Sequence, residues 1–82
     1  MAQKLRIDKR EMGLSERQLN ILNWLRSETN PVAGMGLLAW QLGWRINAPT
    51  ASVRRDIGNL RYAGFVITTV PNIGYVLLHQ GV

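Results

Sequence analysis

The fold of this chain is decided by residues 50–64, which read TASVRRDIGNLRYAG. Apolar side chains recur at Val53, Ile57 and Leu60, and this spacing places them along one side of an α-helix. The glycine at position 64 suits the residue after a helix end, because it adopts a left-handed backbone conformation without strain. We therefore predict one amphipathic helix that buries this apolar side.

The opposite side of this predicted helix, at 100° per residue, carries small, hydrogen-bonding and basic residues and no carboxylate. They are Ala51, Ser52, Arg55, Gly58, Asn59 and Tyr62, with Arg54 and Arg61 on one flank and Thr50 at the start. Arginine can bond guanine, asparagine can bond adenine, and serine can reach bases or phosphates. We predict that residues 50–62 enter the major groove of double-stranded DNA.

A solvated helix face is the plainer interpretation of the same residues. Arg54 and Arg55 would then face water, with Asp56 or another acid as a partner, and such surface pairs contribute only about 0–1 kcal/mol. Gly58 costs a helix about 0.5–1 kcal/mol relative to alanine. Close approach of a DNA backbone explains this glycine, and a tolerated surface glycine explains it equally well.

Positive charge gathers at two places in this chain of 82 residues, whose net charge is +5. Residues 1–11 carry four basic and two acidic side chains, and residues 45–61 carry four basic side chains and one acidic one. Such clusters are typical of proteins that bind polyanions, although many small proteins are basic for unrelated reasons. Residues 62–82 carry no charged side chain apart from any charge on His79.

The composition argues against an enzyme. The chain has no cysteine, so disulfides and thiolate metal sites are excluded. Asp56 is the only acid after Glu28, and His79 is the only histidine. A catalytic carboxylate pair is therefore hard to build, no glycine-rich phosphate loop is present, and no metal or cofactor is expected.

The composition also bounds size and location. A chain this short forms one domain at most. No apolar run approaches the roughly 20 residues of a membrane span, and the N-terminus is too polar for a secretory signal. We expect a soluble cytoplasmic protein without a membrane partner.

A first helix is predicted from Ser15 to about Glu28. The segment SERQ forms a capping box at its start, and Asn30-Pro31 breaks it. Its apolar arc consists of Leu19, Ile21, Leu22 and Leu25, with Trp24 at the edge.

A second helix is predicted to start near Gly34 to Gly36 and to cover residues 37–42. Gly43 is expected to end it in the left-handed conformation. Leu38 and Leu42 are expected to face the core, and Trp40 points to nearly the opposite side.

The segments around this second helix are predicted to be irregular. Residues 31–33 form a very short extended piece, and residues 44–49 form a connection. The third helix is capped either by Thr50, which we prefer, or by Asn47 with Pro49 inside the first turn.

A β-hairpin is predicted after the third helix. Residues 65–70 are rich in β-branched side chains, residues 71–74 read PNIG and suit a turn, and residues 75–78 form the return strand. The predicted fold class is thus α+β, with three helices followed by a hairpin.

Residues 14–78 form the predicted domain. Residues 1–13 are interpreted as a basic arm, flexible or loosely docked, that either reaches a minor groove or phosphates or remains a solvated tail. Residues 79–82 form a short C-terminal tail.

Three helices followed by a hairpin is the order of a winged helix-turn-helix domain. Residues 38–43, LAWQLG, resemble the first helix of the helix-turn-helix pair, and residues 52–64 are similar to the recognition helix of DeoR-type repressors. Residues 70–77, VPNIGYVL, resemble the wing of the biotin-operon repressor. The resemblance covers about residues 14–78. It implies a sequence-specific DNA-binding protein, either a transcriptional regulator such as a repressor or a recombination or partition accessory factor.

The chain departs from this family pattern at two points. The six-residue connection over residues 44–49 is longer than usual, and Arg45 within it is expected to add DNA contacts. The hairpin has no lysine or arginine, so Asn72 is its one obvious polar side chain for a DNA contact.

The three tryptophans, Trp24, Trp40 and Trp44, are expected in the core, with Trp40 as the exception. It either packs on the N-terminal arm or anchors a second protomer, and we predict a homodimer because one such module offers limited area for specific DNA binding. No small-molecule effector is evident. The uncharged C-terminal quarter favours an alternative function as a protein–protein interaction module. RNA binding is less favoured, because no exposed aromatic sheet surface is predicted.

Overall fold

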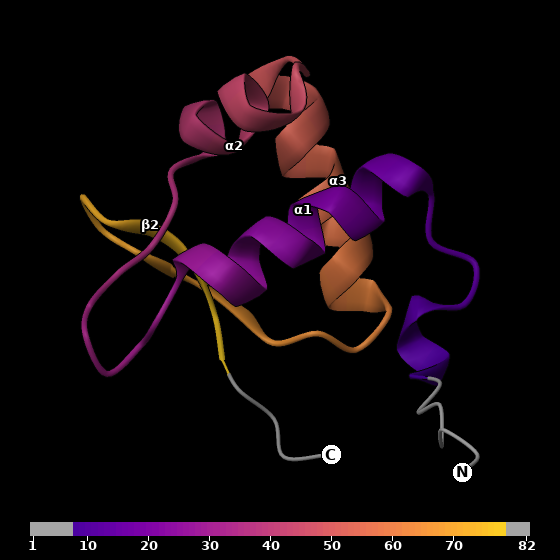
Figure 1. Cartoon of the computed structure of the whole chain (residues 1–82), viewed down its shortest axis with the longest axis horizontal. Coiled ribbons are helices and arrows are strands. Elements are labelled where there is room, and N and C mark those ends of the chain that lie inside the picture. The colour runs from indigo at the N-terminus through magenta and orange to yellow at the C-terminus, as the bar shows by residue number, and fades with distance from the viewer. Residues whose placement is uncertain (1–7, 79–82) are drawn as a thin grey trace, which may run out of the picture.

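Three α-helices precede a two-stranded antiparallel hairpin in the computed structural model, which describes residues 8–78 (Figure 1). This small α+β order is the one predicted. The elements are a 3-10 helix η1 (Lys9–Glu11), then α1 (Glu16–Glu28), α2 (Ala39–Ile46), α3 (Thr50–Tyr62), β1 (Ile67–Val70) and β2 (Gly74–Leu77).

The predicted bounds of α1 are confirmed. Ser15 Oγ accepts a hydrogen bond from the backbone N–H of Gln18 at 3.1 Å, and Gln18 Oε1 accepts one from the Ser15 N–H at 3.0 Å. This reciprocal capping box satisfies two of the backbone donors that a helix start leaves unpaired. Beyond the far end of α1, Thr29 Oγ1 accepts a bond from the Leu77 N–H at 3.1 Å, which fastens β2 to α1.

The core lies where the three helices and the hairpin meet. As predicted, α1 and α3 each bury one apolar face, and α3 ends just before Gly64, whose φ is +113°. Leu37 is buried, whereas Leu38, expected in the core, is only partly buried because it forms the N-cap of α2. The buried apolar side chains are Ile21, Leu22, Leu25, Leu37, Ala39, Leu42, Val53, Ile57, Leu60, Phe65, Ile67 and Val76.

Both predicted ends of the second helix are wrong: it starts at Ala39 and not near Gly34 to Gly36, and it does not end at Gly43. Helix α2 runs from Ala39 through Gly43 to Ile46, and Asn47 supplies the left-handed residue with a φ of +57°. Gly43 serves another purpose, because a Cβ atom there would lie 2.5 Å from the carbonyl oxygen of Ala48. The glycine thus lets the following turn close against the helix.

The connection between α2 and α3 is consequently shorter than predicted. It spans residues 47–49, three residues in place of six. Pro49 occupies the N-cap position of α3 and makes no side-chain cap hydrogen bond, so the predicted Thr50 cap is wrong and Thr50 is the first helical residue. The extension of α2 through residue 46 accounts for both corrections.

The hairpin pairs Ile67 with Leu77 and Val70 with Gly74. In its turn, the Ile73 N–H donates a hydrogen bond to the Val70 carbonyl at 3.0 Å. Asn72 has a φ of +66°, as the third position of a type II turn requires. Strand β1 begins two residues later than predicted and ends as predicted, and β2 lies one residue earlier than predicted. The first begins late because the chain must carry Phe65 into the core after α3.

The segment between α1 and α2 forms a turn and then a single β-bridge to β2, between Leu37 and Tyr75. Asn30 Oδ1 accepts hydrogen bonds from the backbone of residues 32 and 33, and this side-chain turn replaces the predicted extended piece. Leu37 and Tyr75 then exchange two backbone hydrogen bonds, at 3.0 and 2.7 Å. The hairpin is thereby held against the start of α2.

The part of the N-terminal arm that the structure describes is docked. Arg10 lies over the ring of Phe65 at 4.2 Å and pairs with Asp8 at 2.7 Å. The side chain and the backbone N–H of Arg10 donate hydrogen bonds to the Asp8 carboxylate, and these bonds lower the pKa of Asp8 to about 2. Residues 1–7 of the predicted arm and the predicted tail, residues 79–82, lie outside the described residues.

One charged side chain is buried among these packed elements. Asp56 of α3 is 2% exposed and accepts hydrogen bonds from Arg17 Nε at 2.5 Å, Arg17 Nη2 at 3.2 Å and Gln18 Nε2 at 3.3 Å. Hydrogen bonding to this carboxylate raises the pKa of Arg17. The pair joins the first turn of α1 to the middle of α3, so it fixes how α3 is rotated about its own axis.

Among residues 8–78, no helix combines the length and the apolar character needed to cross a membrane.

We predict that the two partners of this ion pair are unequal in their effect on stability. Asp56→Ala should lower the free energy of unfolding by about 1–3 kcal/mol through lost hydrogen bonds, since the half-exposed Arg17 can return to water. Arg17→Met should be more destabilising, because it leaves a carboxylate buried without its cation. Urea unfolding of both variants measures the order.

The matched control is Arg26→Met, which removes a surface pair with Glu11 and should change stability by only about 0–1 kcal/mol. An Arg17→Met variant that is no less stable than Asp56→Ala contradicts the assignment of Asp56 as the buried charge.

Candidate nucleic-acid interface

The outer side of α3 is exposed from Arg54 to Tyr62. Arg54, Arg55, Gly58 and Asn59 are exposed, and Tyr62, at 96% exposure, projects almost entirely into solvent. Two further residues predicted for this site, Thr50 and Ser52, are partly buried at the start of the helix. The structure therefore brings six of the eight predicted site residues to one helix, namely Thr50, Ser52, Arg54, Arg55, Asn59 and Tyr62.

The arginines of the chain divide into two groups. Of the seven within residues 8–78, five are held by contacts inside the protein. The side chains of the remaining two, Arg54 and Arg55, bind no acceptor within the described residues. The five held arginines are Arg10, Arg17, Arg26, Arg45 and Arg61.

Burial of Asp56 makes the outer side of α3 purely basic. It is the only acid of this helix, and its carboxylate faces α1 and not the two neighbouring arginines. The interpretation in which Asp56 partners Arg54 or Arg55 on a solvated surface is therefore wrong. The positive charge of these two side chains is not paired within residues 8–78.

Arg61 is exposed as well, but it differs from Arg54 and Arg55 because its guanidinium is bound within the protein. Its Nε donates to the Ile67 carbonyl at 2.8 Å, and its Nη2 donates to Thr69 Oγ1 at 3.0 Å. The guanidinium also lies 5.7 Å from the centre of the Tyr75 ring. Arg61 thus attaches the hairpin to the last turn of α3, and the flank position predicted for it serves the fold.

Arg45 is also engaged within the protein. Because α2 extends to Ile46, Arg45 lies on a helix rather than in a loop, and it points toward α1. It pairs with Glu28 at 3.6 Å and lies 5.4 Å from the centre of the Trp24 ring. The structure does not bring this predicted contact residue together with Arg54 and Arg55.

Asn72 is exposed at the tip of the hairpin, in the turn that joins β1 to β2. No hydrogen bond within residues 8–78 links its side chain to α3. Of the predicted site residues, it is the one that belongs to the hairpin.

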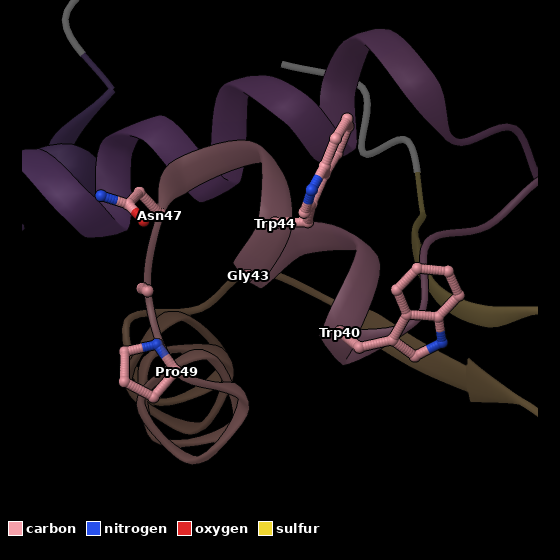
Figure 2. Close-up of a pocket in the computed structure, with 6 residues that line it drawn as sticks. Trp40, Gly43, Trp44, Asn47 and Pro49 are labelled. Atoms are coloured by element: carbon pink, nitrogen blue, oxygen red, sulfur yellow. The ribbon is translucent and has the colours of Figure 1, made fainter.

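A second exposed surface was predicted only in part, since the sequence placed Trp40 but not Trp44 outside the core. Trp44 is 81% exposed and Trp40 is 61% exposed, so the prediction of Trp44 in the core is wrong. The two indoles project from successive turns of α2, because the helix continues through Gly43 and places residues four apart on one side (Figure 2). Recognition that Gly43 is helical would have revealed this pair.

Within the described part of the chain, residues 8–78, no group of three or more histidine, cysteine or acidic side chains is arranged to hold a metal ion. Comparison with family models, with curated proteins and with solved structures found no match.

The two helical glycines should respond oppositely to substitution. Gly58→Ala adds a methyl group in open space on the outer side of α3, so it should raise stability by about 0.5–1 kcal/mol. Gly43→Ala places that group 2.5 Å from the Ala48 carbonyl oxygen, so it should lower stability by about 1–3 kcal/mol. Thermal unfolding of the two variants checks this. Equal changes of the same sign would show that the turn at residues 47–49 is not packed as described.

Proposed function

We propose that this protein binds double-stranded DNA and reads sequence by placing the outer side of α3 in the major groove. The observation that carries the proposal is the division of the arginines: Arg54 and Arg55 alone among the seven described are without an internal partner. Two adjacent unpaired guanidiniums on a face free of carboxylates suit phosphates and the acceptor edge of guanine.

The arrangement of α2 and α3 supports this proposal. The two helices pack together through Gly43 and Val53 and are joined by three residues, a length compatible with the short turn of a helix-turn-helix pair. The sequence resemblance to winged helix-turn-helix domains rests on the same segments. We propose that the hairpin is the wing of such a domain.

The proposed contacts fall into two classes with different energetic consequences. Arg54, Arg55 and Asn59 are the candidates for base edges, where a good bidentate contact contributes about 1–3 kcal/mol of discrimination. Thr50, Ser52 and Tyr62 carry hydroxyls near the ends of the helix and are candidates for phosphates.

The two remaining predicted residues are placed differently. Arg45 is left out of the proposed interface because Glu28 already pairs with it. Asn72 is proposed as a contact of the wing. Its exposed amide sits on a hairpin without cationic side chains, so the wing should add little electrostatic affinity.

We propose that the cellular role is regulation of transcription, or an accessory role in another DNA transaction such as recombination or partition. Both roles need sequence-specific binding, and the way in which α3 is anchored in the fold supports the proposal. Three contacts anchor α3, namely Asp56 to α1, Arg61 to the hairpin, and the Gly43 packing to α2.

A winged helix that binds protein instead of DNA is the second candidate function. The exposed Trp40 and Trp44, together with the uncharged hairpin, favour it. Salt separates the two functions. Binding to random duplex through Arg54 and Arg55 weakens steeply as salt rises, and a chain that binds no duplex at low salt is not a DNA reader.

We predict that Arg55→Gln lowers affinity for duplex DNA while the thermal midpoint stays within about one degree of the wild type, since this side chain binds nothing inside the fold. If Arg55 meets a phosphate, the salt slope should fall by about one unit. If it meets a base, discrimination between a selected site and random duplex should fall by about 1–3 kcal/mol. Fluorescence anisotropy titrations at several salt concentrations measure both.

The charge-matched control is Arg26→Gln, because Arg26 is engaged with Glu11 on another part of the surface. It removes the same charge and should leave the salt slope and the discrimination as they are in the wild type. Equal effects of the two substitutions would mean that net charge, and not the outer side of α3, determines binding.

A further inference from the structure

The strongest feature that DNA binding leaves unexplained is the pair of exposed indoles on α2. Trp40 and Trp44 together present about 350 Å² of mostly apolar surface to water, if a fully exposed tryptophan offers roughly 250 Å². A patch of this size is comparable to the largest apolar patch of a typical monomer, and such a patch often has a function. The DNA-reading residues do not include either tryptophan.

A hollow lies beside these indoles. It has a volume of about 500 Å³, opens to solvent, and has Gly43 between the two indoles on one side and Asn47 and Pro49 on the other (Figure 2). The lining residues are Trp40, Gly43, Trp44, Asn47, Ala48 and Pro49. We call this surface the tryptophan face.

The tryptophan face carries a projection and a recess side by side. An interface between two identical copies related by a two-fold axis must be self-complementary, since each patch meets itself. A face with a protruding indole next to an open hollow meets this requirement, because each copy can insert Trp44 into the hollow of the other.

Charge also selects a second copy as the occupant. The chain has a net charge of +5, so most faces of two copies repel each other. The tryptophan face is lined by uncharged residues alone, and the nearest cation in sequence, Arg45, is turned toward Glu28 on α1. It is a surface on which two copies can meet without opposing like charges.

We propose that the tryptophan face binds the tryptophan face of a second copy and forms a two-fold homodimer. About 350 Å² of indole surface is less than half of the roughly 800 Å² that each partner contributes to a standard stable interface. The dimer is therefore weak and depends on concentration. Arg54 and Arg55 do not line the tryptophan face, so the outer side of α3 stays free when two copies associate.

Sedimentation velocity on the full chain over a wide range of concentrations tests this proposal in the absence of DNA. The wild type should shift from 9.3 kDa toward twice that mass as the concentration rises. Trp44→Ser should weaken the dimer about tenfold or more, as loss of a central aromatic anchor does. Val32→Ser is the matched control, since Val32 is an exposed apolar residue outside the tryptophan face and its loss should change nothing.

Tryptophan emission on the same samples reports the contact itself. The wild-type emission maximum should move to shorter wavelength with concentration as Trp40 and Trp44 leave water, and circular dichroism should show that every variant is folded. A wild type that stays at 9.3 kDa with constant emission overturns the proposal, as does a Trp44→Ser variant that associates as well as the wild type. Neither result bears on DNA binding, because no DNA is present.

Discussion

The contact between the buried Asp56 carboxylate and the start of α1 determines which side of α3 faces solvent. A charge so far from water is tolerated only with a cation and enough donors, and Arg17 and Gln18 at the start of α1 provide three hydrogen bonds. Gln18 also closes the capping box of α1, so the same amide group stabilises the helix start and binds α3. The single acid of α3 is thus removed from its outer surface, and the helix is held in one rotational setting.

The distribution of arginines follows from this packing and links the fold to the proposed function. Arg17, Arg45 and Arg61 each connect two elements: α1 to α3, α2 to α1, and α3 to the hairpin. What remains at the centre of the exposed surface of α3 is Arg54 and Arg55. A helix whose rotation is fixed from the inside and whose free charge is on the outside is suited to a rigid, charged and chemically specific groove such as that of DNA.

The sequence was sufficient for features with a local cause. The apolar spacing of Val53, Ile57 and Leu60, and the capping box at Ser15, each predicted an element that the structure contains. Gly43 misled because glycine serves two purposes, a helix end and a close backbone approach, and only the position of the Ala48 carbonyl distinguishes them. The partners of the arginines could not be predicted for a related reason. Arg17 and Asp56 lie 39 residues apart in the sequence, and no sequence pattern connects them.

Nuclear magnetic resonance of the ¹⁵N-labelled chain, titrated with a short duplex at low salt, tests the central claim most directly. The account predicts that the largest amide shift changes fall on residues 51–59 of α3 and that the side-chain Nε–H signals of Arg54 and Arg55 move, while that of Arg61, held by the hairpin, moves least. Shift changes confined to α2 or to the hairpin, or no change on addition of duplex, would contradict it.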